Sequence, residues 1–166
     1  MAGMVNSLLE ILNEQHSRYS DLLGLSQEKR DVIVANDVEG LQKITHLENI
    51  LISQNQKLEK KRIEITKDIA LVLGANEEEL TVSTLAELLD GQNEQNELIE
   101  LGKKIRQTMG ELSEINAYNA SLIDNALDYV EFSLNIIRST AEQDPTYYSA
   151  LGEPVRNNTG AFDAKN

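Results

Sequence analysis

Apolar residues recur at steps of three and four along the first part of the chain. This spacing places them on one side of an α-helix, which we predict over residues 3–35. The stripe comprises Val5, Leu8, Leu9, Leu12, Tyr19, Leu22, Leu23, Val32 and Ile33. Asn36 and Asp37 follow it, and their short side chains can accept hydrogen bonds from the free N–H groups that begin a helix. We therefore expect a tight turn into a second helix over residues 37–73.

The second helix carries a heptad pattern, in which one position of every seven is apolar. That position holds Ile44, Leu51, Leu58, Ile65 and Val72. The companion position, which is apolar in most coiled coils, is polar here and holds Glu48, Asn55 and Arg62. Such a thin seam predicts packing against one partner helix and not against a broad core. Gly74 suits the left-handed conformation that ends many helices.

A short connector and a third long helix follow. We expect the connector over residues 82–90, with a capping box of Thr84 and Glu87 and its end at Gly91. The third long helix is predicted over residues 93–141. Its apolar residues form two series with seven-residue steps, Leu98, Ile105 and Leu112 in one, and Leu101, Ile115, Leu122, Tyr129 and Ile136 in the other.

Helices of this length define the expected fold class. At about 1.5 Å per residue, the second and third long helices each extend for about 50 Å or more, which a compact globule does not accommodate. We predict an all-α fold, an elongated antiparallel coiled coil or three-helix bundle over residues 1–141. Residues 142–166 are expected to form a flexible, irregular tail, because Pro145 blocks further helix and glycine and asparagine follow it.

Composition narrows the classes of function. The formal net charge of -13 at pH 7 repels phosphates and anionic lipids, so neither nucleic acid nor a membrane is expected as a partner. The absence of cysteine removes thiol chemistry and suits a reducing compartment. The start of the chain lacks the basic region of a signal peptide, and no segment approaches the roughly 20 apolar residues of a membrane span. We expect a cytoplasmic protein.

No constellation of residues predicts catalysis, a metal or a cofactor. His16 and His46 stand in neither the HExxH nor the ExxH spacing of metal sites. Gly102 and Lys103 lack the preceding glycine of a phosphate-binding loop, and no serine or tyrosine has an identifiable base partner. The basic segment 57–67 is either a docking patch for an acidic partner or, as we favour, a solvated helix face.

The last part of the third long helix is apolar on more than one side. One row, the distal stripe, comprises Ile123, Leu127, Val130, Leu134 and Ile137. A second row, the flanking stripe, comprises Leu122, Tyr129 and Ile136, with Phe132 close by. Two interpretations stay open, a partner-binding surface and burial in a locally thicker bundle or a homodimer seam. Asn119, at a seam position beside these rows, is expected to fix the register of helix pairing.

Tyr147 and Tyr148 leave a similar choice. They form either a linear recognition motif in the tail or an aromatic cluster folded back on the end of the bundle.

Several segments can be read in chain order. A long first helix ends before NDVEGLQKITHLE, a charged second helix runs into KKRIEI, a short segment reads LTVSTLAELL, and a long helix reaches NALDYVEFSLNII before a TYYSALG tail. This order resembles the FlgN family of flagellar type III export chaperones over essentially the whole chain. The resemblance implies a cytoplasmic, non-enzymatic chaperone that binds the C-terminal amphipathic helix of hook-filament junction (hook-associated) proteins. It would prevent their premature polymerisation and deliver them to the type III export gate.

The resemblance also implies roles for particular residues. By position, the distal stripe of Ile123, Leu127, Val130, Leu134 and Ile137 would bind cargo, and Tyr147 or Tyr148 would dock on the export-gate protein. The implied partners are hook-associated junction proteins and the export-gate protein, and a homodimer is a further option. Two alternatives stay open, a homo-oligomeric coiled-coil scaffold and a chaperone of another type III secretion substrate.

Overall fold

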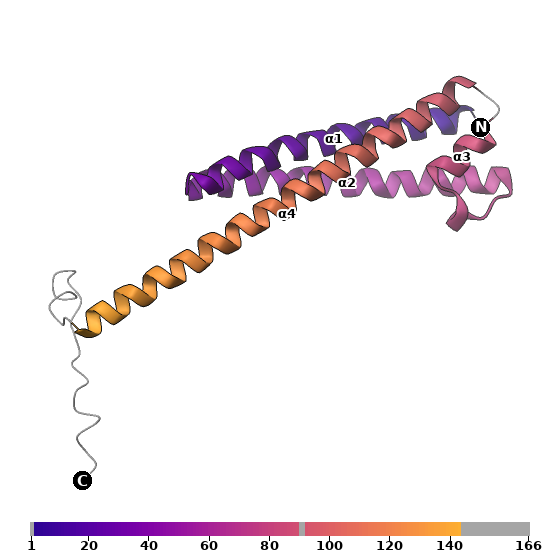
Figure 1. The fold of residues 1–166 in the computed structure, drawn as a ribbon. Coiled ribbons are helices and arrows are strands. Elements are labelled where there is room, and N and C mark those ends of the chain that lie inside the picture. The colour runs from indigo at the N-terminus through magenta and orange to yellow at the C-terminus, as the bar shows by residue number, and fades with distance from the viewer. Residues whose placement is uncertain (1, 90–91, 144–166) are drawn as a thin grey trace, which may run out of the picture. The chain divides into compact units, whose positions relative to one another are not determined.

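The computed structural model describes residues 2–89 and 92–143 of the chain, and all of its elements are helices. They are α1 (Ala2–Val34), α2 (Val38–Leu73), the short 3₁₀ helix η1 (Glu77–Glu79), α3 (Val82–Leu88) and α4 (Gln92–Gln143). Figure 1 shows the four α-helices. The predicted all-α fold is confirmed, with the ends of the helices within about two residues of those expected. The tail from residue 144 onward lies outside the described residues.

The chain forms two compact units. The first, which we call the bundle unit, covers Met1–Leu122. The second covers Ile123–Asn166, and its described part is the continuation of α4 from residue 123 to residue 143.

A tight turn joins α1 to α2. Asn36 takes a left-handed φ of 55°, a conformation that asparagine tolerates better than most residues. Asp37 is the N-cap of α2, and its Oδ1 accepts a hydrogen bond from the backbone N–H of Gly40 at 2.9 Å. Of the two capping candidates in the sequence, one therefore makes the turn and the other caps the helix.

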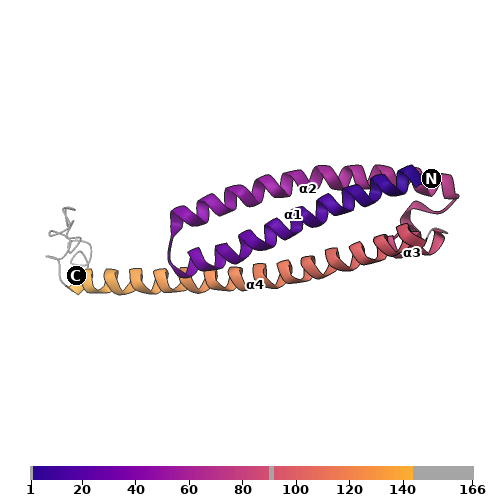
Figure 2. The ribbon, with the colours of Figure 1, turned by 90° about the horizontal axis from the view of Figure 1, so that it is seen from above.

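α1 and α2 run antiparallel and lie side by side along their lengths (Figure 2). Gln15 donates a hydrogen bond from Nε2 to Glu59 Oε2 at 3.0 Å. Farther along α1, Lys29 Nζ lies 2.9 Å from Glu48 Oε2. Residue numbers on α2 fall as those on α1 rise, as antiparallel packing requires.

α4 runs parallel to α1 within the bundle unit. His16 Nε2 lies 3.2 Å from Thr108 Oγ1, and Ser26 Oγ donates to Asn116 Oδ1 at 3.0 Å. Residue numbers rise together on the two helices, so α4 is antiparallel to α2. The bundle unit is thus an antiparallel three-helix arrangement with α3 as its connector.

The apolar core of the bundle unit lies at the end where α1 begins and α2 ends. Its buried residues come from α1, α2, α3, α4 and the loop after η1, and they are Val5, Leu8, Leu9, Leu12, Ile69, Ala70, Leu80, Leu85, Ala86, Leu98 and Leu101. In the predicted heptad of α2, Ile44 and Leu58 are buried but Val72 is exposed. A straight α-helix drifts by about 20° per heptad, which over four heptads turns Val72 outward and brings Ile69 into the core.

The predicted capping box of the connector helix is wrong, although α3 begins at residue 82 as expected. Thr81, not Thr84, is the N-cap of α3, and Thr84 takes the place in the capping box that was predicted for Glu87. The backbone N–H of Thr84 donates to Thr81 Oγ1 at 3.1 Å, and the backbone N–H of Thr81 donates to Thr84 Oγ1 at 2.7 Å. A threonine hydroxyl can accept as well as donate, so it fills the position that glutamate usually takes. α3 ends at Leu88, before the predicted end, and Gly91 lies outside the described residues.

Replacing Gly74 with alanine is expected to lower the free energy of unfolding by about 1 kcal/mol. Gly74 caps α2 with a left-handed φ of 63°, where a Cβ is strained. Gly110 lies inside α4, and a Cβ there meets nothing within 4 Å. Gly110→Ala should therefore raise the free energy of unfolding by about 0.5–1 kcal/mol. Urea unfolding followed by circular dichroism tests the opposite signs, and equal effects of the two variants would contradict this assignment.

Candidate partner-binding surface

The distal stripe lies on the part of α4 that belongs to the second unit. Its residues follow one another at steps of four, three, four and three, which are successive seam positions of a coiled coil. Ile123 is half-buried, whereas the exposed fractions of Leu127, Val130, Leu134 and Ile137 range from 42% to 61%. Full burial of such a side chain is worth about 1.5–3 kcal/mol. An amphipathic partner helix would therefore gain substantially by covering the stripe.

The flanking stripe is exposed beyond Leu122, which is half-buried. Tyr129 is 71% exposed, and Ile136 and the nearby Phe132 are exposed as well. Ser133 Oγ donates to the backbone carbonyl of Tyr129 at 2.8 Å, and Thr140 Oγ1 donates to that of Ile136 at 2.9 Å. These hydroxyls are satisfied within their own helix, so this side of α4 can meet an apolar surface without losing hydrogen bonds.

One edge of the distal stripe is charged. Asp124, Glu131 and Arg138 follow one another at seven-residue steps, each directly after a seam residue, and all three are exposed. The ion pairs among the described residues all lie at residue 103 or earlier, so these three charges have no ion-pair partner there. This charged edge is not among the site residues predicted from the sequence, although its seven-residue spacing is visible there.

Asn119 occupies the buried seam position that its place in the sequence predicts. Only 3% of its surface is exposed, and its Nδ2 donates to the backbone carbonyl of Ser26 at 2.8 Å. Its Oδ1 has no hydrogen-bond partner among the described residues. This bond joins α4 to α1 at one longitudinal position, as expected of a residue that fixes register.

A second polar group joins α1 to α2. Glu59 accepts hydrogen bonds from Gln15 and from Arg62, whose Nε and Nη2 lie 2.8 and 2.6 Å from its two oxygens. The hydrogen bond from Arg62 is the main reason that the pKa of Glu59 lies below its ordinary value of 4.5, and partial burial opposes this. The same hydrogen bond raises the pKa of Arg62.

The basic segment 57–67 lies on α2. Lys57, Lys60 and Lys61 are exposed, and Lys67 Nζ lies 3.2 Å from Glu77 Oε1. Arg62 is bound to Glu59 as well, so two of the five basic residues are paired within the bundle unit, and the exposure of the other three fits both interpretations of the segment.

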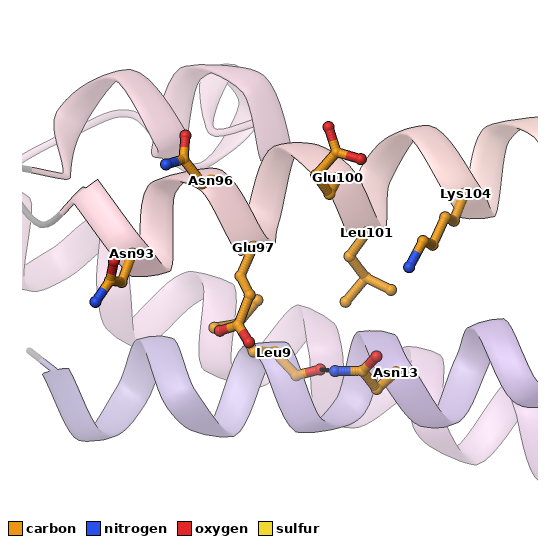
Figure 3. A pocket seen from close by; sticks show the side chains of 8 residues that line it. All are labelled: Leu9, Asn13, Asn93, Asn96, Glu97, Glu100, Leu101 and Lys104. Carbon is orange, nitrogen blue, oxygen red and sulfur yellow. Dashed lines mark hydrogen bonds between the residues drawn. The ribbon is translucent and has the colours of Figure 1, made fainter.

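A cleft of about 600 Å³ lies between α1 and α4 in the bundle unit (Figure 3). Its described lining is mostly amide and carboxylate side chains, and the residues are Leu9, Asn13, Asn93, Asn96, Glu97, Glu100, Leu101 and Lys104. Asn13 Nδ2 donates to the backbone carbonyl of Leu9 at 3.0 Å. No nucleophile paired with a base is present among these side chains.

The remaining sequence candidates are dispersed. His16 is half-buried against Thr108, and His46 is exposed on α2. Within residues 2–89 and 92–143, no three His, Cys, Asp or Glu side chains are grouped so as to hold a metal ion. No helix in the same ranges is long and apolar enough to cross a bilayer. Tyr147 and Tyr148 lie outside the described residues.

These features define a class of protein, a helical bundle whose last helix presents an exposed apolar surface suited to binding another helix. The model of the FlgN protein family matches residues 1–156, and the chain belongs to this family. The resemblance found in the sequence is thereby confirmed. Since the FlgN family is a family of flagellar export chaperones, this protein is a flagellar export chaperone that binds export substrates. No curated protein and no solved structure matches the chain.

Proposed function

We propose that this chaperone works in the cytoplasm on hook-filament junction (hook-associated) proteins. It binds their C-terminal amphipathic helix, prevents premature polymerisation and delivers them to the type III export gate. The observation that carries this proposal is the exposed distal stripe of α4. A cargo helix that lays its apolar face on this stripe can no longer use that face for self-association.

The dimensions of the distal stripe suit a single helix. It covers residues 123–137, about 20 Å of α4, and presents five aliphatic side chains in seam positions. Ordering the partner and losing its translational freedom offset much of the free energy of burial. A contact of this size favours micromolar binding, from which cargo can be released at the gate.

Docking at the gate is proposed for the tail. The resemblance places this role on Tyr147 or Tyr148, where an aromatic ring in an otherwise polar segment supplies the contact area. A tail contact of this kind leaves the distal stripe free to hold cargo.

The test is a calorimetric titration of the chain with the C-terminal helix of a junction protein from the same genome. Native protein should bind at micromolar concentration or below, and a Leu127→Asp, Val130→Asp, Leu134→Asp variant should bind at least tenfold more weakly. Because all three residues are exposed, their substitution leaves the bundle core intact.

The matched control is Asn125→Asp, Asn135→Asp and Ser139→Asp, which adds the same charge to exposed positions of α4 outside the distal stripe. It should bind as the native chain does. Equal weakening in both variants would mean that charge, and not the apolar stripe, controls binding. Unchanged affinity in the stripe variant would place the cargo surface elsewhere.

The exposed flanking stripe favours a second candidate, a homo-oligomeric coiled-coil scaffold or a homodimer. In this case the apolar rows of α4 pair with other copies of the chain. Light scattering distinguishes the candidates, because a scaffold stays assembled without cargo and a chaperone forms a one-to-one complex. Binding of a different export substrate in place of the junction proteins would keep the chaperone mechanism and change only its cargo.

A further inference from the structure

We infer that the charged edge of the distal stripe selects the cargo helix by its charge. This inference rests on the proposed function and concerns the same surface. The bound helix carries lysine or arginine where it passes Asp124 and Glu131, and an acidic or uncharged residue where it passes Arg138.

The heptad register of α4 places these charges. Ile123, Val130 and Ile137 repeat one seam position, and the residue directly after each is Asp124, Glu131 or Arg138. Residues directly after this seam position occupy the e position of the heptad. In a coiled coil, side chains at e and g lie along the edges of the seam and face the partner helix, so they set partner choice and orientation.

The opposite edge carries no charge. Ala126, Ser133 and Thr140 repeat the g position at seven-residue steps. Their two hydroxyls donate to backbone carbonyls of α4. Discrimination by charge therefore comes from one edge of the distal stripe.

The charged edge is free to meet a partner. Asp124, Glu131 and Arg138 are exposed and have no ion pair among the described residues. Residues 123–137 contain three acidic side chains, Asp124, Glu131 and the exposed Asp128, and no basic side chain. Together they give the cargo surface a negative local field that attracts a basic helix and repels an acidic one.

Charge complementarity favours a cargo helix over a second copy of the chain. In an antiparallel pair of two copies, Asp124 faces Arg138 of the second copy, but the two Glu131 side chains face each other. A parallel pair sets every charged edge against an uncharged one. A cargo helix with a basic edge complements Asp124 and Glu131 together.

Two designed helical peptides test the inference. They share one apolar seam, and both edges carry lysine in one peptide and glutamate in the other, so the result does not depend on orientation. At low ionic strength the native chain should bind the lysine peptide at least tenfold more tightly than the glutamate peptide. Added salt should shrink this ratio, because exposed charge pairs are screened.

Substitutions locate the effect. Neutralising the edge by Asp124→Asn with Glu131→Gln should remove most of the preference. Glu97→Gln with Glu114→Gln removes two exposed charges elsewhere on α4 and should preserve it. The Leu127→Asp, Val130→Asp, Leu134→Asp variant adds negative charge, yet it should lose the lysine peptide because the apolar seam is gone.

The outcomes separate this inference from the proposed function. Equal affinity for the two peptides at low salt overturns charge selection and leaves the cargo surface in place. The inference is also overturned if the edge variant and the Glu97→Gln, Glu114→Gln variant lose the preference for the lysine peptide equally. In that case the net charge of the chain, and not the charged edge, explains the preference. Failure of both peptides to bind, with self-association through α4, contradicts the inference and the proposed function together.

Discussion

Replacing Leu98 with alanine is expected to lower the free energy of unfolding by about 3–5 kcal/mol. Leu98 is 0% exposed and lies in the core cluster where α4 packs against α1, α2 and α3. Alanine leaves a cavity that the surrounding helices refill only in part, so the loss of dispersion contacts adds to the loss of buried apolar surface.

Leu71→Ala is the matched control, because the same side chain is removed from a helix at a position that is 83% exposed. It should change the free energy of unfolding by less than about 0.5 kcal/mol. Urea unfolding of both variants, followed by circular dichroism, measures the difference. Equal effects at the two positions would place the core elsewhere than at the α3 end of the bundle unit.

Asn119→Asp should lower the free energy of unfolding by about 3 kcal/mol at neutral pH. The substitution keeps the shape of the side chain but replaces the Nδ2 donor by a carboxylate oxygen that faces the backbone carbonyl of Ser26. Burial and this facing oxygen both disfavour the charged form, so the pKa of the new carboxyl should rise above its unfolded value.

The raised pKa of this carboxyl sets the sign of the pH dependence of the variant's stability. A carboxyl with a raised pKa in the folded state is protonated at low pH, where it can donate to Ser26 as the amide does. The loss in free energy of unfolding relative to the native protein should therefore be small near about pH 4 and should grow as the pH increases. Asn49→Asp, at an exposed position of α2, should show no such trend. An Asn119→Asp variant with a pH-independent deficit would contradict this account.

The sequence predicts the long helices well because their heptad patterns are long and continuous. The sequence predicts helix caps and the burial of single residues less well, because these depend on one turn of a helix. Thr81 and Thr84 both carry hydroxyls that can cap a helix, and the choice between them depends on the burial of Leu85 and Ala86 against the bundle. Val72 keeps the seven-residue step of α2 but leaves the core, because a straight helix does not follow that step over four heptads.

The candidate surface could be predicted only as a set of residues. The apolar rows at the end of α4 have the same sequence pattern whether other helices bury them or solvent surrounds them. Their exposure depends on how many neighbours the fold supplies, which periodicity does not encode. The charged edge at Asp124, Glu131 and Arg138 was present in the sequence all along, but its meaning depends on knowing that the seam beside it is exposed.

The uneven distribution of the core within the bundle unit implies a gradient of local stability. Near α3, α4 is held by the buried Leu98 and Leu101, whereas near the α1–α2 turn its contacts include the amides of Asn116 and Asn119. Segments that bury less apolar surface open at a lower free energy. Backbone amides of α4 should therefore exchange with solvent deuterium faster toward residue 122 than near residue 98. The bundle unit can thus loosen toward residue 122 while its core stays closed.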